Sequence, residues 1–135
     1  MDDTDMGTLD SALGISPQVL ALRAQKTELL AANIANSDTP GYKARDIDFS
    51  AAMANASGAQ EALTRTHAAH LSTSGTPGNV EPMYRVPTQP SLDGNTVESQ
   101  REHAEFMDNA MRYQASLNLL DGRINSLRTA IRGQV

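Results

Sequence analysis

The side chains best suited to chemistry in this chain are His67 and His70, which form a His-x-x-His pair. On a helix, two imidazoles at this spacing could share a zinc ion. Zinc needs a third and usually a fourth protein ligand, but only Glu61 lies nearby and the chain has no cysteine. We therefore expect these histidines to belong to a polar surface, and we predict no metal site.

Two other sets of residues have side chains of the kinds that act in catalysis. Asp46 and Asp48 alternate with apolar residues, which is typical of a half-buried extended segment rather than of an acid and base pair. Ser11, Ser16 and Ser37 lack the glycine elbow of a nucleophilic serine, and the sequence contains no glycine-rich phosphate loop. The sequence therefore predicts no enzyme and no bound cofactor.

The composition agrees with a structural rather than a catalytic protein. The 135 residues are enough for a single domain, and only 4% of them are aromatic, which disfavours a densely packed core. A net charge of −5 argues against nucleic acid as a partner, because phosphate binding needs clustered lysine and arginine. Without a long apolar run or a basic start, the sequence predicts neither a membrane span nor a cleaved signal peptide.

The chain divides into two helical ends and a loop-rich middle. We expect one mainly all-α domain over 1–135, in which two long helices pack as an antiparallel coiled-coil hairpin. Prolines and turn residues crowd the middle, where 83–86 could be extended, Asp93-Gly94 is typical of a tight turn, and a short β-hairpin could form. The predicted segments are an N-terminal helix over 9–36, a turn- and loop-rich middle over 37–95 and a C-terminal helix over 96–132.

The C-terminal helix carries the clearest periodicity in the chain. Apolar residues recur there at alternating spacings of 4 and 3 residues, which is the pattern of a coiled-coil seam. Asn95 or Thr96 is expected to cap the start of this helix. We call these apolar positions the predicted seam, and they are Phe106, Ala110, Tyr113, Leu117, Leu120, Ile124, Leu127 and Ile131.

The N-terminal helix shows apolar or alanine residues on several faces. Ser16-Pro17 is typical of a helix start, or of the restart of a helix that begins near Leu9. One partner helix covers only one stripe, and exposed apolar patches usually mark protein contacts. We interpret the chain as a hairpin that is completed by copies or relatives of itself. The alternative is a soluble bundle that closes internally.

A distinctive stretch at residues 32–43 reads Ala-Asn-Ile-Ala-Asn-Ser-Asp-Thr-Pro-Gly-Tyr-Lys. Asn36 and Asp38 favour a helix end, and Pro40 disfavours helix at the residue before it. Pro40-Gly41 is typical of a turn in which the glycine takes a positive φ. Taken alone, this stretch predicts a helix exit.

The same stretch resembles the N-terminal signature of the bacterial flagellar axial proteins, the rod and hook family. Segment 43–49, the turn at 93–97 and the Arg-Tyr-Gln-Ala-Ser run at 112–116 are similar to a proximal rod protein of that family. The residues that match the family motif are Asn33, Asn36, Thr39, Pro40, Gly41 and Tyr42.

The resemblance implies a structural subunit of the proximal rod of the flagellar basal body, on the periplasmic side of the inner membrane. Members of the family are exported unfolded by the flagellar type III apparatus, and their terminal helices self-assemble into a tube that transmits torque for motility. The implied partners are copies of the chain, rod proteins of the FlgC type, the adaptor FliE and the export gate. The alternatives are another rod protein of the FlgC type, or a soluble helical adaptor or export chaperone.

Overall fold

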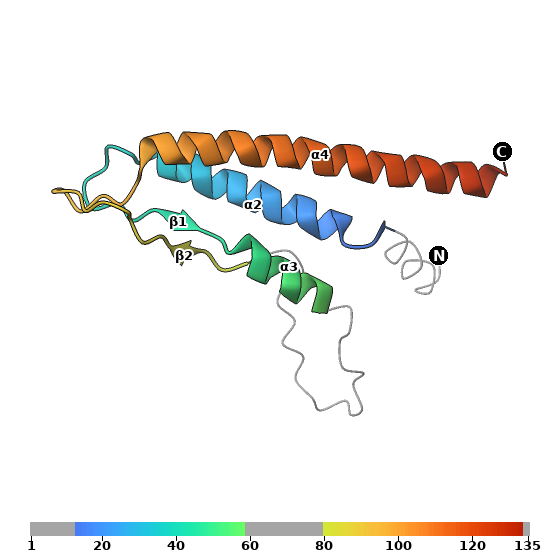
Figure 1. The fold of residues 1–135 in the computed structure, drawn as a ribbon, viewed down its shortest axis with the longest axis horizontal. Coiled ribbons are helices and arrows are strands. Elements are labelled where there is room, and N and C mark those ends of the chain that lie inside the picture. The colour runs from blue at the N-terminus through green and yellow to red at the C-terminus, as the bar shows by residue number, and fades with distance from the viewer. Residues whose placement is uncertain (1–12, 59–79, 134–135) are drawn as a thin grey trace, which may run out of the picture.

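The computed structural model describes residues 13–58 and 80–133, so the pair His67 and His70 lies outside the described residues. The described chain is mainly helical, and its two long helices, near the N- and C-termini, lie side by side (Figure 1). This confirms the predicted fold class. The elements in chain order are α2 (Ser16–Ala35), β1 (Arg45–Asp46), α3 (Phe49–Gly58), β2 (Met83–Tyr84) and α4 (Ser99–Arg132).

Contacts at the two ends of the helix pair show that α2 and α4 run antiparallel. Asn33, near the end of α2, donates to Glu102 near the start of α4 at 3.1 Å. Ser16, at the start of α2, accepts from Arg123 in the second half of α4 at 3.3 Å. Because α2 has 20 residues and α4 has 34, α4 extends beyond its partner at the C-terminal end.

The helix starts agree with the sequence only in part. Pro17 lies in the first turn of α2, as Ser16-Pro17 predicted, and Ile15 occupies the N-cap position. α4 begins at Ser99 with Glu98 at its N-cap position, so the prediction that Asn95 or Thr96 caps this helix is wrong. The amide nitrogen of Asn95 and the hydroxyl of Thr96 bind backbone groups of other segments instead.

The helix α3 replaces part of the loop that the sequence predicted over 37–95. Asp48 accepts a hydrogen bond from the backbone N–H of Ala51 at 2.9 Å, so its carboxylate caps a helix rather than continuing an extended segment. The alanine-rich sequence that follows has high intrinsic helix propensity, and Ala52 is buried against Leu22 and Ile47.

The two strands form a small antiparallel sheet in which Arg45 pairs with Tyr84 and Asp46 with Met83. The extended segment expected near Met83 is therefore present. Its partner lies far away in the sequence, with α3 between the two strands, so they do not form the local hairpin that the sequence allowed. The sheet lies beside α2, which contacts β1 (Figure 1).

Buried polar residues are as numerous as buried apolar ones in the described part of the chain. The set of buried apolar residues is small, as the low aromatic content predicted. No described helix combines the length and apolar character needed to cross a membrane. Hydrogen bonds and ion pairs must therefore supply much of the order between elements. The buried apolar residues are Leu22, Leu30, Ala44, Ile47 and Ala52, and the buried polar residues are Ser16, Asn33, Asn95, Glu102 and Asn109.

Candidate functional site

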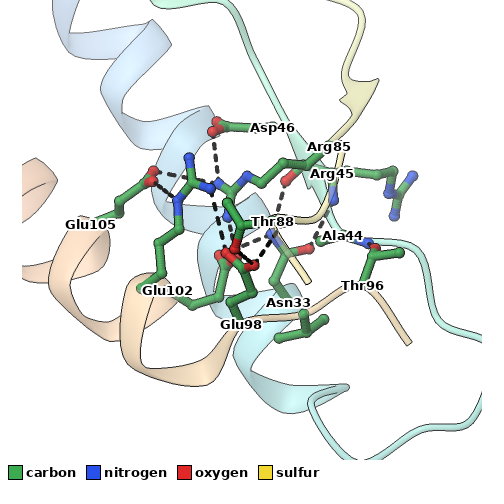
Figure 2. Close-up of polar contacts among 12 residues, drawn as sticks. Asn33, Ala44, Arg45, Asp46, Arg85, Thr88, Thr96, Glu98, Glu102 and Glu105 are labelled. Carbon is green, nitrogen blue, oxygen red and sulfur yellow. Dashed lines mark hydrogen bonds and ion pairs between the residues drawn. The ribbon is translucent and has the colours of Figure 1, made fainter. Parts of the chain in front are cut away.

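The family motif lies where α2 ends and the chain turns back toward β1, and it is contacted there by residues 91–97. We call the contact between residues 33–42 and 91–97 the motif corner. Figure 2 shows Asn33, Arg85 and Glu102 pointing toward one another from α2, from the residue after β2 and from α4. Three parts of the chain that are distant in sequence therefore meet beside this corner.

Asn33 connects these parts through a single buried amide group. Its Nδ2 donates to the backbone oxygen of Arg45 at 2.8 Å and to Glu102 Oε2 at 3.1 Å. Its Oδ1 accepts from the backbone N–H of Arg45 at 3.0 Å and from the Tyr42 hydroxyl at 3.4 Å. The amide thus pairs with both backbone groups of Arg45, much as a neighbouring strand would, and joins α2 to β1 and α4.

Asn36 and Thr39 close the end of α2. The Asn36 side chain donates back to the Ala32 carbonyl at 2.8 Å, and the same carbonyl accepts from the Asn36 backbone N–H at 3.1 Å. Thr39 donates its hydroxyl to Asn36 Oδ1 at 3.2 Å, and its backbone N–H donates to the Asn36 carbonyl at 3.1 Å. These contacts confirm the helix exit that the sequence predicted, while Pro40 is exposed just beyond it.

Gly41 takes the positive φ that the sequence predicted, with a value of 73°. Its backbone N–H donates to the Asp93 carbonyl at 2.9 Å, which ties the two sides of the motif corner together. A Cβ at Gly41 would meet nothing within 4 Å, so the requirement for glycine is conformational and not steric. Gly94, at the facing turn, has a φ of 75°.

Asn95 holds the other side of the motif corner. Its Nδ2 lies 3.1, 2.8 and 2.9 Å from the carbonyl oxygens of Asn36, Ser37 and Thr39. Its Oδ1 accepts from the backbone N–H of Val97 at 2.8 Å. The nitrogen of this buried amide therefore binds carbonyls that follow the end of α2, while its oxygen is occupied by Val97, before α4 begins, and does not cap the helix.

A cluster of charged residues lies beside the corner and is centred on Arg85 (Figure 2). The Arg85 guanidinium pairs with Glu102, with Asp46 at 2.7 Å and with Glu105 at 3.4 Å. Lys26 adds a second cation, 3.6 Å from Asp46 and 3.5 Å from Glu105. The side chain of Glu102 is 0% exposed and that of Arg85 is 8% exposed, so each charge depends on its partners for the solvation that it has lost.

Two carboxylates near the corner have a lowered pKa. The Ser91 hydroxyl, followed by the backbone N–H of Asn95, lowers the pKa of Asp93. The hydroxyl and then the backbone N–H of Thr88 lower the pKa of Glu98. Both shifts arise because hydrogen bonds favour the charged form of the carboxyl group.

The structure divides the predicted seam into two stripes. One stripe is half-buried and consists of Phe106, Tyr113, Leu120 and Leu127. The other stripe is more open, because Ala110, Ile124 and Ile131 are exposed and only Leu117 is half-buried. No residue of the predicted seam is fully buried within the described chain.

The residues of α4 that are buried against α2 are polar. Asn109 donates to the Arg23 carbonyl at 3.0 Å and to the Thr27 hydroxyl at 2.9 Å, and Glu102 accepts from Asn33. Glu102 and Asn109 are seven residues apart, which is one heptad, and they lie next to the half-buried apolar stripe. The contact with α2 therefore combines one polar and one apolar stripe.

Sequence reasoning missed most of the residues that hold this site together. Glu102 and Asn109 leave a weak signal, since polar residues repeat at the heptad spacing beside an apolar stripe. Arg85 leaves none, because nothing in the local sequence indicates which carboxylates it will meet. The part of the chain that the structure describes contains no group of three or more His, Cys, Asp or Glu arranged to hold a metal ion.

Comparison with known proteins gives a consistent result. The family model described as "Flagella basal body rod protein" matches residues 20–43, which include the whole motif. "Flagellar basal body rod protein FlgB" of Cereibacter sphaeroides is 52% identical over 122 residues, covering 90% of this chain and 94% of that protein. The protein of the same name from Escherichia coli is 46% identical over 130 residues, covering 91% of this chain and 94% of that protein.

A third relative extends the agreement. "Flagellar basal body rod protein FlgB" of Salmonella typhimurium is 45% identical over 132 residues, covering 93% of this chain and 96% of that protein. The similarity therefore includes both long helices and the segment between them, and it is not confined to the short motif. The chain belongs to the FlgB family of flagellar basal body rod proteins and is a structural subunit rather than an enzyme.

Proposed function

We propose that this chain is a subunit of the proximal rod, on the periplasmic side of the inner membrane, and that its packed helices transmit torque. The observation that carries the proposal is the uncovered apolar surface of α4. Met107, Met111, Leu119 and Ile131 are 63%, 72%, 60% and 81% exposed. Apolar residues on this scale along one helix favour contacts with other proteins.

The predicted seam has a role in this proposal. Its half-buried stripe packs toward α2 in the single chain, and its open stripe is free to meet another subunit. We propose that this open stripe, which consists of Ala110, Leu117, Ile124 and Ile131, packs against neighbouring rod subunits. The motif residues then act by fixing the direction in which the chain leaves α2, so that β1 and α3 are held in place beside the helix pair.

The proposed partners are copies of this chain and rod proteins of the FlgC type, with the adaptor FliE and the export gate at the base of the rod. Export through the flagellar type III apparatus is part of the same proposal. The relatives described above favour a FlgB-type subunit over a FlgC-type one, because the similarity covers about nine-tenths of the chain.

Imaging of purified basal bodies that carry this subunit with a tag tests the proposal. We expect density for the tag in the proximal part of the rod. Density further along the rod would favour a different rod position. A tagged chain that stays in the cytoplasm and never enters basal bodies would contradict the proposal and favour the adaptor or export chaperone.

A further inference from the structure

A hollow of about 440 Å³ lies between α2, the start of α3 and the first half of α4. Four basic and three acidic side chains line it, which leaves one positive charge in excess in a chain whose net charge is −5. This local balance is opposite in sign to that of the whole molecule. A concave site with an excess charge attracts groups of the opposite sign.

The excess charge can be assigned to one residue. Among the basic side chains of the hollow, Lys26, Arg101 and Arg112 each form an ion pair, and the pair of Arg112 is with Asp108 at 2.8 Å. Arg23 forms no ion pair with a carboxylate among residues 13–58 and 80–133. Its guanidinium lies 4.4 Å from the centre of the Phe49 ring and donates one hydrogen bond to Asn109 at 3.3 Å.

Arg23 is also incompletely bonded. Its Nε is buried and has no hydrogen-bond acceptor, a state that costs free energy because a charged donor has lost its water. Burial, and then the nearby Arg112 guanidinium, lower the pKa of Arg23. Besides burial, the largest electrostatic influence on the pKa of Arg23 is thus a like charge, which the Asp108 carboxylate offsets only in part. A further carboxylate between the two guanidinium groups would offset the remaining repulsion and supply an acceptor.

We propose that this hollow binds a carboxylate side chain of a second copy of this chain, held between Arg23 and Arg112. The inference rests on the proposed function, since it needs copies to meet in the rod. A second copy suits the site by charge, because it is itself acidic and exposes carboxylates such as Glu28, Glu81 and Asp121 that form no ion pair among the described residues. Arginine is well suited to this role because its planar donors match the two oxygens of a carboxylate.

Zero-length cross-linking in purified basal bodies tests the proposal. The variant Arg112→Lys keeps the positive charge and adds an amine that a carbodiimide couples to a carboxylate in direct contact. We expect a cross-linked dimer of this chain above the wild-type level, with the link between position 112 and an Asp or Glu of the second copy. Arg45→Lys is the matched control, because Arg45 is exposed and does not line the hollow, and it should give no added dimer.

Charge reversal provides a second measurement. Arg112→Glu should lower incorporation into basal bodies about tenfold or more, because like charges facing each other at an interface are strongly unfavourable. Arg45→Glu should leave incorporation unchanged. Circular dichroism of the two purified variants should match that of the wild type, since the Arg112 and Asp108 side chains are each 62% exposed and their ion pair contributes little to folding.

The outcomes separate this inference from the proposed function. If the tagged wild-type chain is absent from basal bodies, the proposed function fails. If the wild type is present, but Arg112→Lys gives only the internal link to Asp108 and Arg112→Glu enters normally, only the carboxylate site is overturned. A link to a different rod protein would overturn the second copy as the occupant.

Discussion

The two ends of α4 differ in what surrounds them. At its start, Glu102 and Asn109 are buried and hydrogen-bonded to α2. Toward its end, Leu119 is 60% exposed and Ile131 is 81% exposed. The buried side chains of α4 therefore lie only in its first half within the described chain, whereas exposed apolar side chains occur along the whole helix, because Met107 and Met111 are also 63% and 72% exposed. Folding thus depends mainly on the first half of α4, while both halves leave apolar surface for assembly.

From this comparison, we expect substitutions in the charged cluster to have the largest effect on the free energy of unfolding. Arg85→Leu should lower the free energy of unfolding by about 3–5 kcal/mol, because it leaves the buried carboxylate of Glu102 without its cation. The measurement is urea unfolding of the purified chain, followed by circular dichroism. Arg101→Leu is the control, and it should cost under about 1 kcal/mol because the Arg101 side chain is 44% exposed. Equal costs for the two variants would contradict the proposed importance of the cluster.

The next largest effect is expected at the motif corner. Asn95→Ala should cost about 1–3 kcal/mol, because it removes the donor shared by the carbonyls of Asn36, Ser37 and Thr39. Asn125→Ala, an exposed change on α4, should stay within about 0.5 kcal/mol of the wild type. Thermal unfolding of both variants provides the test. An unchanged midpoint for Asn95→Ala would show that this side chain does not stabilise the corner.

A glycine comparison isolates backbone conformation from sterics. At both Gly41 and Gly122 an added Cβ would meet nothing within 4 Å, but only Gly41 has a positive φ. Gly41→Ala should therefore cost about 1–2 kcal/mol. Gly122→Ala should stabilise by about 0.5–1 kcal/mol, because alanine favours helix. Changes of the same sign at both glycines in urea unfolding would contradict the conformational argument.

Acid should loosen the motif corner to a smaller extent. Hydrogen bonds from Ser91 and Asn95 lower the pKa of Asp93 on folding, so its carboxylate stabilises the corner at pH values above its unfolded pKa. That stabilisation is lost as the pH falls through the lower, folded pKa. We expect the backbone amide of Asn95 to exchange hydrogen faster, relative to its intrinsic rate, over that acidic range. Asp93→Asn should remove this pH dependence of exchange. If the variant shows the same pH dependence as the wild type, another titrating group causes it.

The smallest effect on stability is expected at the far end of α4, together with a large effect on function. Ile131→Asp should change the free energy of unfolding by less than about 0.5 kcal/mol, because Ile131 is already exposed. It should nevertheless abolish motility if the open stripe packs against neighbouring subunits. Thr129→Asp lies two residues away on another face of the helix and should allow swimming. Normal swimming of the Ile131→Asp strain would show that this end of the stripe does not pack against a neighbouring subunit.

Several errors of sequence reasoning have one physical origin. The prediction of a cap at Asn95 or Thr96 was reasonable locally, but both side chains bind segments that arrive from elsewhere in the chain. In the same way, Asp48 fits an extended segment until its carboxylate is seen to cap α3. Short polar side chains have several local uses, and tertiary contacts select among them.

The sequence by itself determined the two long helices, the helix exit at Asn36 and the positive φ of Gly41, because periodicity and backbone preference are local properties. Only the tertiary structure decided which stripe of α4 faces α2. Two neighbouring heptad frames share the half-buried stripe of α4, and apolar spacing favours the frame that includes the open stripe. The structure instead turns the polar positions Glu102 and Asn109 toward α2. The choice depends on Asn33 and Arg85, which bind Glu102 from distant parts of the chain and turn its side of α4 inward.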